Sequence, residues 1–222
     1  MVDELRVFVF RHGPFWNFSY LLACSRSGAA AVIDPAWDIA SICETAAREH
    51  LTVELALLTH THSDHLNGLA ELVARTGAAT FVHASEVAHV PGGADLRLGL
   101  LRGGESLRLG EHSIEVLHTP GHSEGSVSFL VDGRLFCGDT LSVGAVGRPG
   151  PGSAAVEALW HSVQAIGRLP ARTVIHPGHD EGRTPTATVG EEHGAIAAWR
   201  CATLDDFVDE LERTTGRVHR HE

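Results

Sequence analysis

A run of seven residues constrains the fold and the chemistry of this chain more than any other feature. Residues 59–65 read Thr-His-Thr-His-Ser-Asp-His and directly follow the apolar stretch 53–58. A strand that ends at Leu58 would place four side chains on one loop: His60, His62, Asp64 and His65. Imidazole and carboxylate together suit zinc, iron or manganese better than calcium or magnesium. The alternative is a His-rich surface loop, since the chain contains 16 His among 222 residues.

Three later segments repeat this arrangement, because in each of them a potential ligand follows a strand-like run. The runs are residues 114–117, 135–137 and 173–175, and the ligands are His122, Asp139 and His179. A neighbouring Gly or Pro ends each extended segment and lets the side chain turn toward a shared edge of the sheet, where sites in layered α/β folds collect. We therefore expect seven potential ligands to converge.

This ordered set resembles the metallo-β-lactamase superfamily, whose His-x-His-x-Asp-His motif is present as residues 60–65. The resemblance extends from about Val7 to Glu192. It includes Ile33-Asp34-Pro35, a strand end whose Asp supports the metal loop in that family. The resemblance implies an α/β fold, namely a four-layered αββα sandwich.

The distribution of strand-like and helical runs is consistent with that layout. Strands are expected at residues 6–10, 20–24, 29–33, 53–58, 79–83, 106–109, 114–118, 127–131, 135–137 and 173–175, and helices at 39–50, 66–76 and 153–166. No Pro/Ser-rich linker interrupts the chain, so we expect one domain over residues 1–222, in which about 192–222 form a helical C-terminal tail. Thr203 and Asp206 are spaced as a capping box for the last helix of that tail.

The resemblance also implies a centre of two divalent metal ions, zinc or zinc with iron. One ion would be bound by His60, His62 and His122, and the second by Asp64, His65 and His179, with Asp139 as the bridge. Metal binding lowers the pKa of water toward about 7, so a metal-bound hydroxide is available as a nucleophile at neutral pH. Asp64 and Asp139 are the predicted catalytic carboxylates, and Asp64 would also orient the attacking hydroxide.

Within the superfamily the chain is similar to the glyoxalase II and persulfide dioxygenase branch, which acts on thiol-linked small molecules. The first interpretation is a metal-dependent hydrolase of a thioester or related acyl-thiol substrate. The second is an Fe(II)-dependent dioxygenase that oxidises glutathione persulfide or a similar thiol persulfide, because segments 177–184 and 188–192 resemble that class. Its single Fe(II) would be held by His60, His122 and Asp139, which leaves positions open for O₂ and the sulfur substrate.

Four residues are predicted to contact the substrate. Phe15 and Trp16 lie in segment 12–17, a turn between the first two expected strands, and would form a wall of the pocket. The alternative is that both rings pack on the edge of the core. Arg148 and Arg183 would hold a substrate carboxylate through paired hydrogen bonds. For these two arginines, simple solvation is the alternative.

Composition excludes several other classes of protein. The formal net charge is −11, and a phosphate backbone is bound largely through Lys and Arg, so we expect no nucleic-acid partner. All 17 basic residues are Arg, and the lack of Lys excludes a Schiff-base mechanism. The four Cys form no Cys-x-x-Cys pair, so neither a disulfide framework nor a zinc ribbon is expected.

The sequence also bears on where the protein works and how it assembles. No apolar run approaches about 18 residues, so no membrane span is expected. The first residues, Met-Val-Asp-Glu-Leu-Arg, include two acidic side chains and differ from a signal peptide. We therefore expect a cytoplasmic protein. A homodimer would be the commonest assembly for such a chain.

Overall fold

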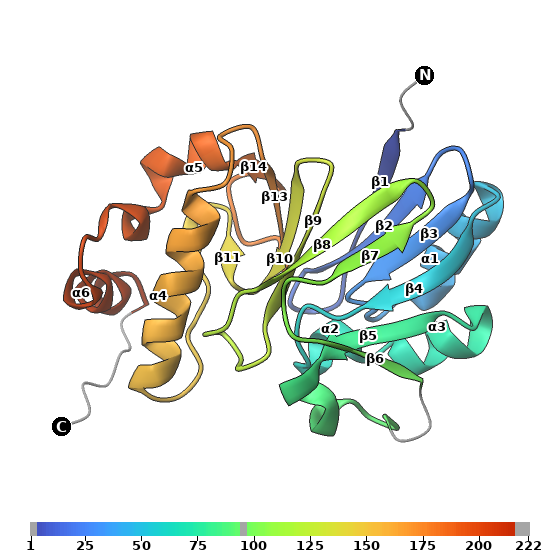
Figure 1. Cartoon of the computed structure of the whole chain (residues 1–222), viewed down its shortest axis with the longest axis horizontal. Coiled ribbons are helices and arrows are strands. Elements are labelled where there is room, and N and C mark those ends of the chain that lie inside the picture. Colours follow the sequence, from blue (N-terminus) through green and yellow to red (C-terminus); the bar gives the residue numbers. More distant parts are fainter. Residues whose placement is uncertain (1–3, 94–96, 216–222) are drawn as a thin grey trace.

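Two six-stranded sheets stack face to face in the computed structural model, and helices cover their outer faces (Figure 1). The structure describes residues 4–93 and 97–215, so residues 216–222 of the predicted tail lie outside the described part. The strand order is β1-β2-β3-β4-β5-β6 in the first sheet and β14-β13-β10-β9-β8-β7 in the second. The predicted four-layered αββα sandwich is thus confirmed.

Each half of the chain supplies one sheet. The first sheet contains β1 (Leu5–His12), β2 (Asn17–Cys24), β3 (Ala29–Ile33), β4 (Thr52–Leu57), β5 (Ala79–His83) and β6 (Leu98–Leu101). The second contains β7 (Ser106–Leu109), β8 (His112–His118), β9 (Val127–Val131), β10 (Arg134–Gly138), β13 (Val174–Pro177) and β14 (Ala187–Thr188). Strands β11 (Leu141–Ser142) and β12 (Ala145–Val146) form a separate pair. Neighbours β3 to β6 run parallel, as do β10 and β13, so their carboxyl ends meet at common edges.

The helices lie on the outer faces of the two sheets. They are α1 (Ile39–Arg48), α2 (Ser63–Leu66), α3 (Leu69–Thr76), α4 (Ser153–Gly167), α5 (Val189–Ala195) and α6 (Leu204–Thr215), with the 3₁₀ helices η1 (Ala84–His89) and η2 (Ala197–Arg200). Helix α1 begins after Asp38, whose side chain accepts a hydrogen bond from the Ser41 N–H and satisfies one free donor of the first turn. The predicted capping pair of α6 is confirmed, because the Asp206 N–H donates to Thr203 Oγ1 at 3.2 Å and the Thr203 N–H donates to Asp206 Oδ2 at 3.1 Å.

Three apolar clusters separate the four layers. The cluster between the sheets joins Leu22 and Leu57 of the first sheet to Val116, Phe129 and Phe136 of the second. A second cluster packs the first sheet against α1 and α3, and a third packs the second sheet against α4, α5 and α6. Strands β2 and β3 are buried along their whole length, as expected for strands that are covered on both faces.

Some elements differ from the prediction. The expected helix 66–76 is divided at residues 67–68, so that α2 and α3 are separate helices. Gly68 packs closely there, since a Cβ on it would lie 2.5 Å from the Ile39 side chain. The expected helical tail is likewise divided into α5, η2 and α6. Strands β6, β14 and the β11–β12 pair were missed, because runs of two to four residues show no clear alternation. Among the described residues, no helix is long and apolar enough to cross a membrane.

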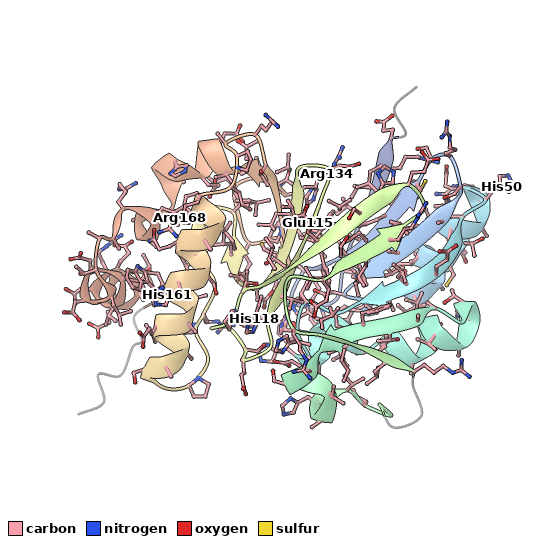
Figure 2. The ribbon with its side chains drawn as sticks, viewed as in Figure 1. His50, Glu115, His118, Arg134, His161 and Arg168 are labelled. Atoms are coloured by element: carbon pink, nitrogen blue, oxygen red, sulfur yellow. The ribbon has the colours of Figure 1, made fainter. Side chains whose placement is uncertain are left out.

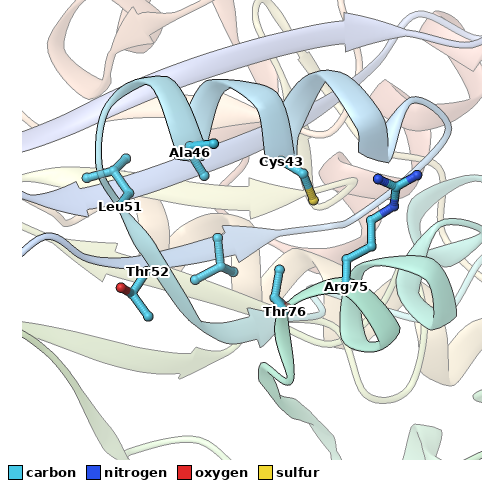
Figure 3. A pocket seen from close by; sticks show the side chains of 8 residues that line it. Cys43, Ala46, Leu51, Thr52, Arg75 and Thr76 are labelled. Carbon is cyan, nitrogen blue, oxygen red and sulfur yellow. The ribbon is translucent and has the colours of Figure 1, made fainter.

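A hollow on the outer side of the first sheet lies between α1, β4 and the end of α3 (Figure 3). Its lining residues are Cys43, Ala46, Ala47, Leu51, Thr52, Val53, Arg75 and Thr76. This set includes none of the seven predicted metal ligands. The hollow is therefore separate from the chemistry that the sequence predicts.

His176 is a buried histidine of β13 that packs like an apolar residue. Its ring stacks on Phe136 with centroids 4.5 Å apart and meets Tyr20 edge-on at 5.4 Å. Neither ring nitrogen has a hydrogen-bond partner among the described residues. Burial, together with the charge of Arg134 at the start of β10 (Figure 2), lowers the pKa of His176 to about 4. The folded protein therefore keeps this imidazole neutral at mildly acidic pH.

We expect His176 to weaken the fold in acid. Between pH 6.5 and about 4 the unfolded chain binds a proton at this residue and the folded chain does not, so the free energy of unfolding falls as the pH is lowered through that window. The loss is on the order of 3 kcal/mol. Urea unfolding of chelator-treated wild type and His176→Phe at pH 7, 6, 5 and 4 measures it. Equal pH dependence in both proteins would contradict the assignment.

Candidate metal centre

The carboxyl ends of four strands deliver the seven predicted ligands to one edge of the sandwich. Strand β4 leads into His60 and His62, and the short helix α2 that follows carries Asp64 and His65. In the second sheet, His122 follows β8, Asp139 follows β10 and His179 follows β13. These side chains gather in two groups, and within each group the ligand atoms lie within 4.8 Å of one another. The structure thus brings together all seven residues.

The first group contains His60, His62, His122 and Asp139. His122 Nε2 lies 2.9 Å from His62 Nδ1 and 3.5 Å from Asp139 Oδ2. His60 Nε2 is buried and has no hydrogen-bond partner among the described residues. Three imidazoles and one carboxylate therefore lie close together. One of their nitrogens, His60 Nε2, is buried without a hydrogen-bond partner among the described residues and is available to a metal ion.

The second group contains Asp64, His65 and His179. His65 Nε2 lies 3.0 Å from His179 Nε2, and Asp64 Oδ2 lies 3.7 Å and 3.6 Å from these two nitrogens. Asp139 stands between the two groups. Its Oδ1 is 3.4 Å from His65 Nε2, and its Oδ2 is 3.3 Å from His179 Nε2. Asp139 thus contacts histidines of both groups.

These spacings fit metal ions better than a network of hydrogen bonds. Four ligands in a tetrahedron around zinc lie roughly 3.3 Å apart, since Zn–N and Zn–O distances are about 2.0–2.2 Å. The separations above scatter around that value, whereas hydrogen bonds to a carboxylate are typically about 2.7–2.9 Å. Asp139 Oδ1, like His60 Nε2, is buried without a hydrogen-bond partner among the described residues. The described side chains can therefore hold two divalent ions.

The charges in the cluster also call for a cation. Burial lowers the pKa of His65, but the carboxylates of Asp139 and Asp34 raise it to about 10. Burial raises the pKa of Asp139, but His65, His179 and His60 hold it well below its usual range. Burial and the neighbouring imidazoles lower the pKa of His60 well below its usual range. Without an ion, a protonated His65 therefore balances the charge of Asp139. A bound cation would take over that role and displace the proton, because metal binding requires the neutral imidazole.

A set of hydrogen bonds holds the ligands in place from behind. Asp34, the predicted support of the metal loop, accepts hydrogen bonds from the Thr59 N–H at 2.8 Å and the Thr59 hydroxyl at 2.6 Å. Its Oδ2 also lies 3.2 Å from His65 Nδ1. His122 Nδ1 lies 2.8 Å from the Arg148 carbonyl oxygen. Such partners fix which ring nitrogen faces the metal.

Asn17 is a supporting residue that the sequence analysis missed. It is fully buried at the start of β2, and its amide donates to Asp64 Oδ2 at 2.9 Å. Its amide oxygen accepts a hydrogen bond from Trp37 Nε1 at 3.0 Å. No spacing in the sequence distinguishes this Asn, and only its burial beside a carboxylate does so.

The predicted substrate residues occupy different places around the cluster. Phe15 and Trp16 are 60% and 54% exposed, so these rings do not pack into the core. The Phe15 carbonyl oxygen lies 2.8 Å from His179 Nδ1, which ties this turn to the second group. Arg148 is exposed beside His122. Arg183 is turned toward the C-terminal part, with its guanidinium 3.9 Å from Glu192 Oε1.

Fold and site together define an αββα metal-binding protein whose His and Asp ligands lie on loops at strand ends. The sequence profile of the metallo-beta-lactamase superfamily matches residues 13–179. The chain therefore belongs to the metallo-beta-lactamase superfamily. In fold it is similar to a metallo-beta-lactamase of Staphylococcus aureus, with a TM-score of 0.85, 28% identity, and coverage of 95% of this chain and 67% of that one.

Curated relatives point to one branch of the superfamily. A hydroxyacylglutathione hydrolase of Methylococcus capsulatus is 38% identical over 166 residues, which cover 74% of this chain and 62% of the relative. The chain thus spans about three fifths of that hydrolase. The probable polyketide biosynthesis zinc-dependent hydrolase BaeB of Bacillus velezensis is 29% identical, with coverage of 78% and 77%. The structure of ETHE1 from Myxococcus xanthus is also similar, with a TM-score of 0.82, 25% identity, and coverage of 97% and 92%.

A side chain at Gly178 should disrupt the centre. A Cβ at this position would lie 2.2 Å from Asp139 Oδ1 and 2.8 Å from His65 Cε1, so both ligands would have to move. We expect Gly178→Ala to lower metal affinity by at least about 10-fold. Gly194→Ala is the matched control, because a Cβ there meets nothing within 4 Å. Zinc titration against a chromophoric chelator measures both, and equal affinities would refute this account of Gly178.

Proposed function

We propose that this chain is a metal-dependent hydrolase of thioesters or related acyl-thiol substrates. The observation that carries the proposal is the pair of ligand groups that share Asp139. The hydroxyacylglutathione hydrolase of Methylococcus capsulatus and the zinc-dependent hydrolase BaeB support a hydrolytic reaction. The ions we propose are two zinc, or zinc with iron, since the imidazole and carboxylate donors suit both metals.

When bound, divalent ions lower the pKa of water and polarise a carbonyl oxygen. The side chains of this chain provide position and charge for that chemistry. Asp64 remains 23% exposed in its side chain, and the Asn17 amide fixes one of its oxygens. We assign it the role of accepting a hydrogen bond from the attacking water and so orienting it toward the substrate. The hydrolysis then requires no Ser or Cys nucleophile.

The thiol-linked substrate would lie against the turn between β1 and β2. The exposed rings of Phe15 and Trp16 offer an apolar surface beside His179. Trp16 also stacks on the Arg11 guanidinium, whose carbon lies 4.9 Å from the ring centroid and which pairs with Asp180. We propose that these rings bind the apolar part of the substrate, and that Arg148 and Arg183 attract a carboxylate. The net charge of −11 favours a small molecule over a nucleic acid as partner, and a homodimer is compatible with this role.

A second candidate is an Fe(II)-dependent dioxygenase acting on glutathione persulfide or a similar thiol persulfide. The similarity to ETHE1 over nearly the whole of both chains favours it. Its ion would be held by His60, His122 and Asp139, all of which lie in the first ligand group. Oxygen consumption by the Fe(II)-loaded protein with glutathione persulfide tests this candidate. Lack of oxygen uptake would remove it.

The zinc-loaded protein should cleave thioesters. We expect hydrolysis of S-lactoylglutathione or of a neutral acyl thioester, followed as free thiol released. Asp64→Asn should lower kcat/KM by about 100-fold, because the substitution removes the charge and one acceptor at the site of attack. Asp209→Asn, a change on α6, is the matched control. If the metal-loaded wild type releases no thiol from a panel of acyl thioesters, the proposed function is wrong.

The aromatic turn should matter for substrate binding more than for turnover. We expect Trp16→Ala to raise KM by about 10-fold for an apolar acyl thioester with little change in kcat, because the lost contact is made equally in ground and transition states. Leu100→Ala is the matched control, since Leu100 is 52% exposed on the outward side of β6. Equal KM values for both variants would argue against a substrate contact at Trp16.

A further inference from the structure

Glu86 is a buried carboxylate outside the seven ligands that touches two of the loops carrying them. It lies in η1, directly after β5, and only 5% of the residue is exposed. Because β5 is the parallel neighbour of β4, η1 begins beside the loop that bears His60 and His62. The position of Glu86 at this strand end makes it a candidate support for the metal centre.

Each carboxylate oxygen of Glu86 binds a different loop. Oε2 accepts a hydrogen bond from the hydroxyl of Thr61, the residue between His60 and His62. Oε1 accepts a hydrogen bond from the Gly125 N–H at 2.9 Å, three residues after His122. One side chain of η1 thus connects the two loops that supply the histidines of the first ligand group.

The turn after His122 fits closely against η1. A Cβ on Gly125 would lie 2.3 Å from Glu86 Cγ and 2.8 Å from His83 Nδ1, so the backbone can approach only as glycine. The His83 ring also stacks on His118, with centroids 4.4 Å apart and planes within 7°. Figure 2 labels His118, at the end of β8. The contact between η1 and the His122 loop is therefore a packed interface rather than a single hydrogen bond.

The carboxylate carries a negative charge in this interface. Burial raises the pKa of Glu86, but hydrogen bonds from Thr61, Ser123 and the Gly125 N–H lower it below its usual value. These three donors are neutral and orient the charge, while nearby His89 partly offsets it. A buried anion that holds Thr61, the residue between His60 and His62, favours a cation nearby, because charges interact more strongly where water is excluded.

We propose that Glu86 is a positioning residue that joins the His60–His62 loop to the His122 loop. It thereby raises the metal affinity of the first ligand group, called the first subsite below; the second ligand group is the second subsite. The second subsite has its own supports, namely the Asn17 amide on Asp64 and the Phe15 carbonyl on His179. Glu86 acts on one subsite and leaves the other unchanged. This selectivity distinguishes positioning of a metal ligand from general support of the fold.

The two subsites can be measured one at a time. The His179→Ala variant lacks a ligand of the second subsite, so only its first subsite is complete. The His62→Ala variant lacks a ligand of the first subsite, so only its second subsite is complete. We expect Glu86→Ala to weaken Zn²⁺ binding by about 10- to 100-fold in the first background and to leave it unchanged in the second. Glu86→Gln, which keeps one acceptor and loses the charge, should fall between Glu86→Ala and the parent. Competition with a chromophoric chelator gives each affinity without any substrate, so the result does not depend on the proposed hydrolysis.

Glu192→Gln is the matched control. Glu192 is another fully buried glutamate, and it accepts a backbone hydrogen bond from the Gly144 N–H. The Glu192→Gln substitution should lower the melting temperature and leave the Zn²⁺ affinity of the first subsite at the parent value. Equal loss of affinity in the Glu86 and Glu192 variants, or parent affinity in folded Glu86 variants, would overturn the proposal.

Thr61 provides a test that leaves Glu86 in place. Thr61→Val removes the hydroxyl donor while keeping the shape of the side chain, and it should weaken the first subsite in the same direction as Glu86→Gln. Thr61→Ser restores the donor and should restore the affinity. These two variants decide the question if Glu86→Ala does not fold, and an affinity that is the same in Thr61→Val and Thr61→Ser would count against the proposal.

Discussion

The metal centre depends on one buried carboxylate, Asp139, which must contact histidines of both ligand groups at once. The backbone around it therefore has to approach closely. Gly178 lies against Asp139 Oδ1, and a Cβ on Gly147 would overlap the Asp139 carbonyl. The parallel pair β10 and β13 shifts register between Phe136 and Gly138, just before Asp139 leaves the strand. Close packing of glycine backbone thus makes room for a carboxylate that lies between the two ligand groups.

The sandwich itself keeps the two sources of ligands aligned. The first sheet supplies the histidines after β4 and the second sheet supplies those after β8 and β13, so sliding of one sheet over the other would separate them. Apolar packing between the sheets resists separation but sets position only loosely. Hydrogen bonds between the sheets, at the edge that carries the ligands, fix their relative position more tightly. The Tyr20 hydroxyl donates to the Pro177 carbonyl at 2.6 Å, and the Phe18 N–H donates to the Gly178 carbonyl at 2.8 Å.

The clustering of the seven residues could be predicted because it depends on local patterns, and the four layers followed from the resemblance to the metallo-β-lactamase superfamily. All four strand-like runs are followed by His or Asp, three of them after a Gly or Pro, and that order is visible without coordinates. Asn17 and Glu86 could not be found in this way, since each reaches a ligand loop that is distant in sequence. The backbone at Trp16 and Trp37 was equally hidden. Both have positive φ, 55° and 58°, which bulky residues rarely adopt and which sequence patterns do not indicate.

Two of the proposed substrate contacts, Phe15 and Arg148, lie in segments whose backbone contacts a predicted metal ligand. The Phe15 carbonyl faces His179 Nδ1 and the Arg148 carbonyl faces His122 Nδ1, while the side chains of both residues are exposed. One peptide unit therefore orients an imidazole while the attached side chain is free to meet a substrate. A displacement of either segment would move a metal ligand as well. Substrate position and ligand geometry are thus coupled through the backbone, which favours rigid segments around the centre over mobile ones.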